Sequence, residues 1–71
     1  MKERVNLADN LRMYRAKNRL SQRELASISG MSHRTIVDAE KSIKHRLSFE
    51  RVLKLAEALD ITLETLIVEK F

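Results

Sequence analysis

The sequence predicts a compact all-α domain of five short helices, formed by residues 1–71 as a single unit. Apolar residues recur at helical spacing in every expected helix, and a Ser or Thr that can cap the first turn precedes four of the five. The chain has no proline, no Gly/Ser-rich linker and a single glycine, Gly30. Short apolar stripes joined by tight connections are typical of a small helical domain rather than a long bundle.

The first helix is expected over residues 7–17. Leu7, Leu11 and Tyr14 stand at positions i, i+4 and i+7, and they therefore share one face. Asn6 is a possible cap for the first turn. The pattern predicts an amphipathic helix of about three turns.

Residues 21–40 contain two short helices, each with its own start signal. Ser21 followed by Glu24 is a capping box, in which the serine oxygen accepts a backbone N–H and the glutamate reaches back to the cap. Gly30 suits the left-handed residue that ends a helix, and Ser32 can cap the next one. The two helices are expected over residues 22–29 and 33–40. A pair of this length, with a connection of about three residues, is a helix-turn-helix, which places its second helix in the DNA major groove.

Two further helices are expected after a polar, basic loop at residues 41–46. Ser48 caps the first, Asp60 ends it in a place where glycine would be easier, and Thr62 caps the second. The apolar residues of both helices form the stripe that we expect to face the core. They are Phe49, Val52, Leu53, Ala56 and Leu59 in the first helix and Leu63, Leu66 and Ile67 in the second.

Positive charge is concentrated in the part of the chain that holds the helix-turn-helix. Residues 1–46 carry eleven Lys/Arg against five Asp/Glu, a balance of +6, whereas residues 47–71 carry three against five, a balance of −2. This is the electrostatic footprint expected for a polyanion partner. Charge alone also fits a solvated basic surface, and it is the combination with the motif that favours double-stranded DNA.

Several functional classes are disfavoured by the composition. The absence of cysteine excludes disulfides and thiolate metal sites and fits the cytoplasm, where a DNA-binding protein would associate with the nucleoid. His33 and His45 have no carboxylate or cysteine at a catalytic or metal-ligand spacing, and there is no glycine-rich phosphate loop. The longest apolar run, residues 66–68, is too short to span a membrane. We therefore expect no enzyme, no metal, no cofactor and no membrane partner.

The second helix of the motif divides into an inward and an outward face. Ile36, Ala39 and Glu40 share the inward face at 3.6 residues per turn. The candidates for contact with DNA bases lie on the outward face or at the helix start. They are Ser32, His33, Arg34, Val37 and Asp38. The candidates for contact with phosphates lie at the start of the preceding helix and in and around the basic loop. They are Gln22, Arg23, Lys41, Lys44 and Arg46.

Arg34 and Asp38 have the clearest chemistry on this outward face. Arg34 can donate two hydrogen bonds to O6 and N7 of guanine, the commonest specific contact in the major groove. Asp38 would be repelled by phosphates, and it makes sense there only as an acceptor from cytosine N4 or as a brace for Arg34 at i−4. Plain solvent exposure of His33, Val37 and Asp38 is the alternative.

Glu40 poses a different problem, because an inward carboxylate without a partner is costly. Arg15 lies at the margin of the apolar stripe of the first helix, four residues after Leu11. We therefore predict an Arg15–Glu40 ion pair between the first helix and the recognition helix. The alternative is that both are ordinary surface charges.

These residues resemble the lambda-repressor-like (Cro/cI, XRE) helix-turn-helix family over most of the chain, from about residue 11 to residue 67. The matching stretches are Tyr14-Arg15, Leu20–Ala26, Gly30–Ser32, Thr35-Ile36, Glu40, Ser48–Glu50 and Leu55–Glu64. The resemblance implies a five-helix DNA-binding domain, usually a dimer on a two-fold operator. It implies a phosphate contact for Gln22 and supports the Arg15–Glu40 pair. It also implies base-edge contacts for residues 32, 33, 34 and 38.

The chain departs from the family pattern at several positions. Arg19, Ser42 and Asp60 stand where the family often has glycine, and the usual proline before the fourth helix is missing. Asp38 stands where Arg, Lys or Gln is more usual, and Val37 where a small polar residue is common. These last two changes make the recognition surface less suited to DNA and more suited to protein.

Two functions follow from these features. The leading one is a sequence-specific transcriptional regulator of phage or bacterial repressor type, acting as a homodimer on a DNA operator. The alternative is a modulator, an antirepressor or corepressor, that uses the same fold to bind a heterologous regulator protein. Apolar residues near the C-terminus offer a surface for the dimer or for such a partner. They are Leu63, Ile67, Val68 and Phe71, of which the first two could equally belong to the core.

Overall fold

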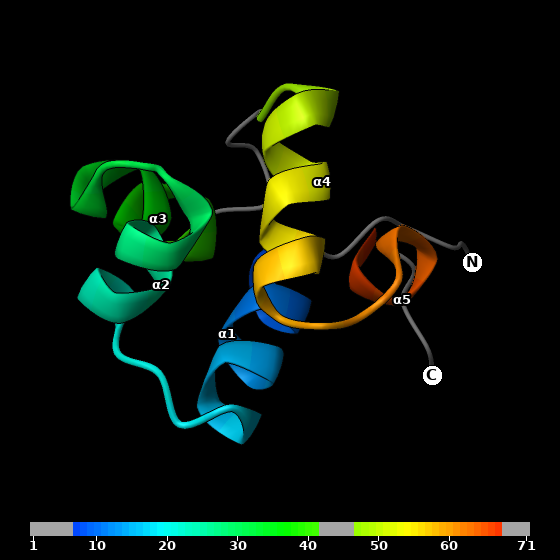
Figure 1. The fold of residues 1–71 in the computed structure, drawn as a ribbon, viewed down its shortest axis with the longest axis horizontal. Helices are drawn as coiled ribbons and strands as arrows, with labels where there is room; N and C mark the ends of the chain where they lie inside the picture. The colour runs from blue at the N-terminus through cyan, green and yellow to red at the C-terminus, as the bar shows by residue number, and fades with distance from the viewer. Residues whose placement is uncertain (1–6, 42–46, 68–71) are drawn as a thin grey trace.

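A computed structural model describes residues 7–41 and 47–67, and within these ranges the chain forms five α-helices and no strand. In chain order they are α1 (Leu7–Lys17), α2 (Gln22–Ser29), α3 (His33–Lys41), α4 (Phe49–Ala58) and α5 (Leu63–Ile67). In Figure 1, α4 stands upright between the α2–α3 pair on one side and α5 on the other, with α1 below. The all-α, five-helix architecture predicted from the sequence is confirmed.

A single apolar core lies where the helices meet, and every one of them contributes to it. The core residues are Leu11, Leu25, Ala26, Ile36, Ala39, Val52, Leu55, Ala56, Leu59 and Leu66. The inward residues predicted for the recognition helix, Ile36 and Ala39, are both among them. None of the helices in the described ranges has the length and apolar character needed to cross a membrane.

Three of the helices end in the same way. A residue one or two positions after the helix takes a left-handed conformation, with φ of 57° at Arg19, 74° at Gly30 and 59° at Asp60. In each case the next residue donates its backbone N–H to a carbonyl five residues back, as in a Schellman motif. That next residue is apolar and packs against the core at all three ends, as Leu20, Met31 and Ile61. Each turn therefore closes a helix and redirects the chain inward.

The buried face of α4 differs from the predicted one. Phe49 and Leu53, which we expected in the core, are 67% and 37% exposed. Leu55, which was not in the predicted stripe, is fully buried. The helix uses the stripe formed by Leu55 with Val52 and Leu59, at i−3 and i+4, and this turns the side that carries Phe49 toward solvent. Both stripes have helical spacing, so only packing against the other helices decides between them.

Arg19 and Asp60 give a test of backbone strain, since a residue with a Cβ adopts positive φ at a cost that glycine avoids. We expect Arg19→Gly to raise the free energy of unfolding by about 0.5–1 kcal/mol. Arg23→Gly, the same substitution at an exposed site inside α2, should lower it by a similar amount. Urea unfolding measures the free energy for both variants, and the dependence of that free energy on urea concentration should be the same as in the wild type. A lower free energy of unfolding in Arg19→Gly would contradict the argument.

Candidate nucleic-acid interface

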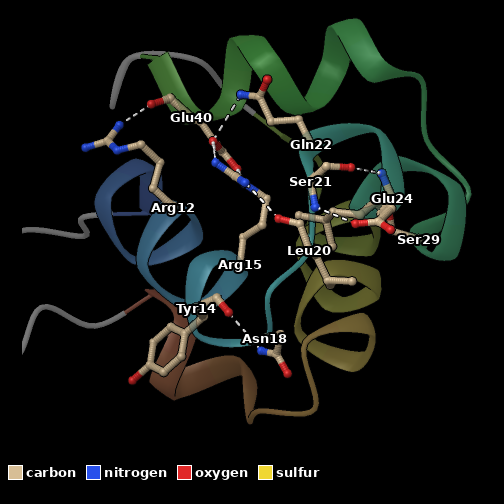
Figure 2. Close-up of polar contacts among 11 residues, drawn as sticks. Arg12, Tyr14, Arg15, Asn18, Leu20, Ser21, Gln22, Glu24, Ser29 and Glu40 are labelled. Carbon is tan, nitrogen blue, oxygen red and sulfur yellow. Dashed lines mark hydrogen bonds and ion pairs between the residues drawn. The ribbon is translucent and has the colours of Figure 1, made fainter.

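The helix-turn-helix is held by caps at both helix starts. Ser21 Oγ accepts the backbone N–H of Glu24 at 3.0 Å, and Glu24 Oε1 accepts the N–H of Ser21 at 2.7 Å, so the predicted capping box is complete (Figure 2). Ser32 Oγ accepts the N–H of Thr35 at 3.1 Å and lies 2.9 Å from the Thr35 hydroxyl. Both starts are therefore fixed by side chains within one helical turn, and the second cap occupies the oxygen of a residue proposed for base contact.

The carboxylate of Glu40 is the centre of the polar contacts between the first three helices. Its side chain is 3% exposed, and Arg15 donates to it through Nε at 2.6 Å to Oε2 and through Nη2 at 3.1 Å to Oε1. Gln22 Nε2 donates to the same Oε1 at 3.1 Å. The ion pair expected between Arg15 and Glu40 is present, and it is a two-pronged, shielded pair with a third donor from α2 (Figure 2).

Two further arginine contacts secure the same junction. Arg15 Nη1 donates to the carbonyl of Leu20, in the turn between α1 and α2, at 2.8 Å. Arg12 donates to the backbone carbonyl of Glu40, near the C-terminal end of α3, and also to the carboxylate of Asp9. A cation at the last turn of a helix interacts favourably with the helix dipole. The two arginines of α1 thus hold both the side chain and the backbone of Glu40.

This junction determines which surfaces remain open. Because Glu40 faces inward near the C-terminal end of α3, the opposite face of that helix is directed away from α1. Gln22 is in the first turn of α2 and contacts the same carboxylate, so the start of α2 lies beside α3. We call the start of α2 together with the outward face of α3 the recognition face.

The predicted base-contacting residues are distributed over this recognition face. Arg34 has 84% of its side chain exposed, and its Nε donates to each carboxylate oxygen of Asp38 at 3.3 Å. Ser32 is exposed, whereas His33, Val37 and Asp38 are partly exposed. Of these candidates, the structure pairs Arg34 with Asp38, while Ser32 precedes α3 as its cap.

The predicted phosphate-contacting residues are only partly assembled by the described chain. Arg23 is exposed in the first turn of α2, and Lys41 is exposed at the end of α3. Gln22 is partly buried, with Nε2 engaged by Glu40, and its backbone N–H belongs to the open helix start. Lys44 and Arg46 lie outside the described residues.

Only two of the four residues expected at a dimer or partner surface lie within the described residues. Leu63 and Ile67 are partly exposed and pack against the core, so they contribute to the fold of the single chain. Val68 and Phe71 lie outside the described residues, as does Asn6, the expected cap of the first helix. Within the described residues no group of three or more His, Cys, Asp or Glu side chains is arranged to hold a metal ion.

Two contacts were not predicted from the sequence. Asn10 is buried, and its Nδ2 donates to the carbonyl of Leu66, 56 positions away in the chain, at 2.8 Å. Arg12 was not assigned a role, although its Asp9 partner at i−3 is a local signal for an ion pair. The polar residue Asn10 within the apolar stripe of α1 was the only hint of the first contact, and it did not name a partner.

The capped helix pair, the buried junction and the exposed recognition face are the features of a helix-turn-helix protein. Comparison with known sequences identifies the family. A helix-turn-helix family model (HTH_3) matches residues 11–66, and the chain therefore belongs to this family.

Individual relatives are similar over most of the chain. The control protein C.SmaI from Serratia marcescens is 36% identical over 64 residues, which cover 90% of this chain and 75% of that protein. The structure of the restriction-modification controller protein C.AhdI from Aeromonas hydrophila superposes with a TM-score of 0.82 and 35% identity, covering 89% of this chain and 94% of that one. The N-terminal DNA-binding domain of SinR from Bacillus subtilis has a TM-score of 0.83 at 25% identity, covering 90% and 93%.

The buried junction predicts a strong dependence of stability on Arg15. Arg15→Ala leaves the Glu40 carboxylate buried without its main partner, and we expect it to lower the free energy of unfolding by about 3–5 kcal/mol. Arg34→Ala breaks an ion pair that is exposed, and it should cost about 0–1 kcal/mol. Urea unfolding of both variants measures the difference, and equal losses would show that burial of Glu40 has no special cost.

Proposed function

We propose that this protein is a sequence-specific, DNA-binding transcriptional regulator that inserts α3 into the major groove. The observation that carries the proposal is the recognition face, where the exposed Arg34 stands on a helix whose opposite side is locked to α1 and α2. A helix fixed in this way, with an arginine whose Nε is held by Asp38 and whose Nη groups point to no acceptor within the described residues, is suited to reading base edges, because its donors are positioned before DNA arrives. Membership of the helix-turn-helix family supports the proposal. So do the relatives named as a control protein, a controller protein and a DNA-binding domain.

The residues of the recognition face take two roles in this proposal. Arg34 and its neighbours on α3 meet the base edges, with Val37 available for a thymine methyl group. Arg23, Lys41 and the start of α2 at Gln22 meet phosphates, since an open helix start attracts anions. The basic residues Lys44 and Arg46 extend the phosphate contacts. The protein would act by binding in the cytoplasm, at nucleoid DNA, and not by catalysis.

We also propose that two copies bind a two-fold operator. A single module that contacts only one half-site binds weakly, and joining two modules raises the effective affinity. Half-sites would then be spaced about 34 Å apart, one turn of DNA. Leu63, Ile67, Val68 and Phe71 remain the candidate surface for this contact.

A protein target is the second candidate function. It is favoured by Val37, an apolar side chain that is partly exposed on the recognition face, together with the acidic Asp38 beside it. The SinR–SinI complex shows a protein of the same fold paired with another protein, although at 23% identity this likeness concerns the fold alone. In this case α3 would grip another regulator, and affinity for DNA would stay at the non-specific level.

The salt dependence of DNA binding tests the role of the phosphate contacts. Titration against the DNA flanking the protein's own gene should give tight binding, with log K falling by about 0.9 per phosphate contact for each unit of log salt. Arg23→Ala and Lys41→Ala should each reduce this slope by about 1. Lys17→Ala removes the same charge from the last turn of α1, where the ammonium lies over the Tyr14 ring, and should leave the slope unchanged.

Arg34→Ala belongs in the same titration, because it removes a base contact while keeping the fold. We expect it to lower the preference for the operator over unrelated DNA. Binding by the wild type at only the non-specific level would contradict the proposal and favour a protein target, which a pull-down against neighbouring regulators would then examine.

The assembly state gives a separate prediction. Sedimentation equilibrium should show an average mass that rises above the 8.3 kDa of one chain as concentration increases, because the dimer forms reversibly. Operator DNA with both half-sites should bind more tightly than DNA with one. A mass of one chain at every concentration, combined with equal affinity for the two DNAs, would contradict the dimer.

A further inference from the structure

Arg34 and Asp38 form an ion pair on the recognition face. Both residues belong to α3, so the pair does not join one helix to another. Arg34 Nε donates to Oδ1 and Oδ2 of Asp38, each at 3.3 Å. Within residues 7–41 and 47–67, the Arg34 guanidinium has no other hydrogen bond, and its side chain is 84% exposed. Such an exposed pair one helical turn apart contributes little to stability. Its position therefore calls for a reason other than the fold.

The geometry of the pair decides which part of the guanidinium is presented to DNA. Asp38 engages only Nε, and both Nη groups are left as a free pair of donors. This free end matches the two acceptors O6 and N7 of guanine. Adenine carries an N6 amino donor in the corresponding place, so the same two donors would face a donor. The braced side chain thus favours guanine over adenine.

The negative charge of Asp38 weakens binding to DNA, so its position on this face needs an explanation. A carboxylate on the DNA-facing side of α3 is repelled by phosphates, and it lowers affinity for every sequence alike. The brace is favourable only where Arg34 finds its base, because an arginine held in one orientation loses less freedom on binding. Asp38 therefore exchanges general affinity for discrimination between sequences.

We propose that Asp38 is a positioning residue for Arg34 and that the pair selects a guanine in each operator half-site. This inference rests on the proposed function, since it requires α3 to lie in the major groove. It names Arg34 as the residue that touches the base and Asp38 as the residue that orients it. Direct acceptance by Asp38 from cytosine N4 is the competing role, and it would act at a different base.

Selection from a pool of random DNA duplexes, followed by sequencing, tests the inference. The wild type should enrich sites in which one position of each half-site is guanine, preferred over adenine by about 5- to 150-fold. Arg34→Lys keeps the charge but loses the fork, and it should flatten the preference at that position. Asp38→Ala should reduce the preference at the same position. Asp38→Asn, which keeps an acceptor oxygen, should give an intermediate value.

Matched variants separate the brace from the change in charge. Asp38→Ala and Asp38→Asn remove the same charge, so they should raise affinity for unrelated DNA equally, and any difference between them at the guanine reports the brace. Glu57→Gln removes one negative charge from the exposed side of α4 and should leave the base preference as it is in the wild type. Thermal unfolding of each variant confirms that the fold is retained.

Three results would overturn the inference, and they can be told apart. If Asp38→Ala preferred guanine as strongly as the wild type does, no brace would be needed. A change in Asp38→Ala at a base other than the one affected by Arg34→Lys would assign Asp38 a direct contact of its own. Enrichment of no sequence by the wild type would remove the proposed function itself, and the inference with it.

Discussion

The buried carboxylate of Glu40 is the constraint on which the arrangement of the first three helices depends. A carboxylate that is 3% exposed has lost its water, and that loss costs several kcal/mol unless a charged partner and further hydrogen-bond donors replace the water. The partners come from separate elements, with Arg15 from α1 and Gln22 from α2. A domain of this size has a free energy of unfolding of only about 5–15 kcal/mol, so these helices cannot move independently without exposing or orphaning that charge. The position of the recognition face relative to α1 is therefore tied to this junction.

Most of the helix limits could be predicted from signals between residues that are close in the sequence. The capping box of Ser21 and Glu24 and the left-handed turn at Gly30 depend on residues within four positions of each other, so the helix limits could be predicted closely. The Arg15–Glu40 pair could be predicted because an inward carboxylate must have a cation near it. Helical spacing then placed the two residues on facing helices.

The parts that could not be predicted depend on packing between distant segments. The apolar residues of α4 form two overlapping stripes, and the sequence alone does not say whether Leu53 or Leu55 is buried. The Asn10–Leu66 hydrogen bond joins α1 to α5 across most of the chain, and nothing local to either residue identifies its partner. On the recognition face, the sequence left three possibilities for Asp38: a brace for Arg34, a cytosine contact and plain solvent exposure. Only the three-dimensional structure shows the bond to Arg34.

The two ion pairs of α3 illustrate how one short helix keeps folding and recognition apart. Glu40 and Asp38 are two residues apart, and in a helix such residues point in different directions. The inward pair, Arg15–Glu40, is shielded from solvent, and breaking it lowers the free energy of unfolding. The outward pair, Arg34–Asp38, is exposed, and breaking it changes that free energy little. Substitutions on the outward side can therefore alter which DNA is bound while the junction at Glu40 stays intact. That separation explains how Val37 and Asp38 can depart from the family pattern in a chain whose fold remains that of the family.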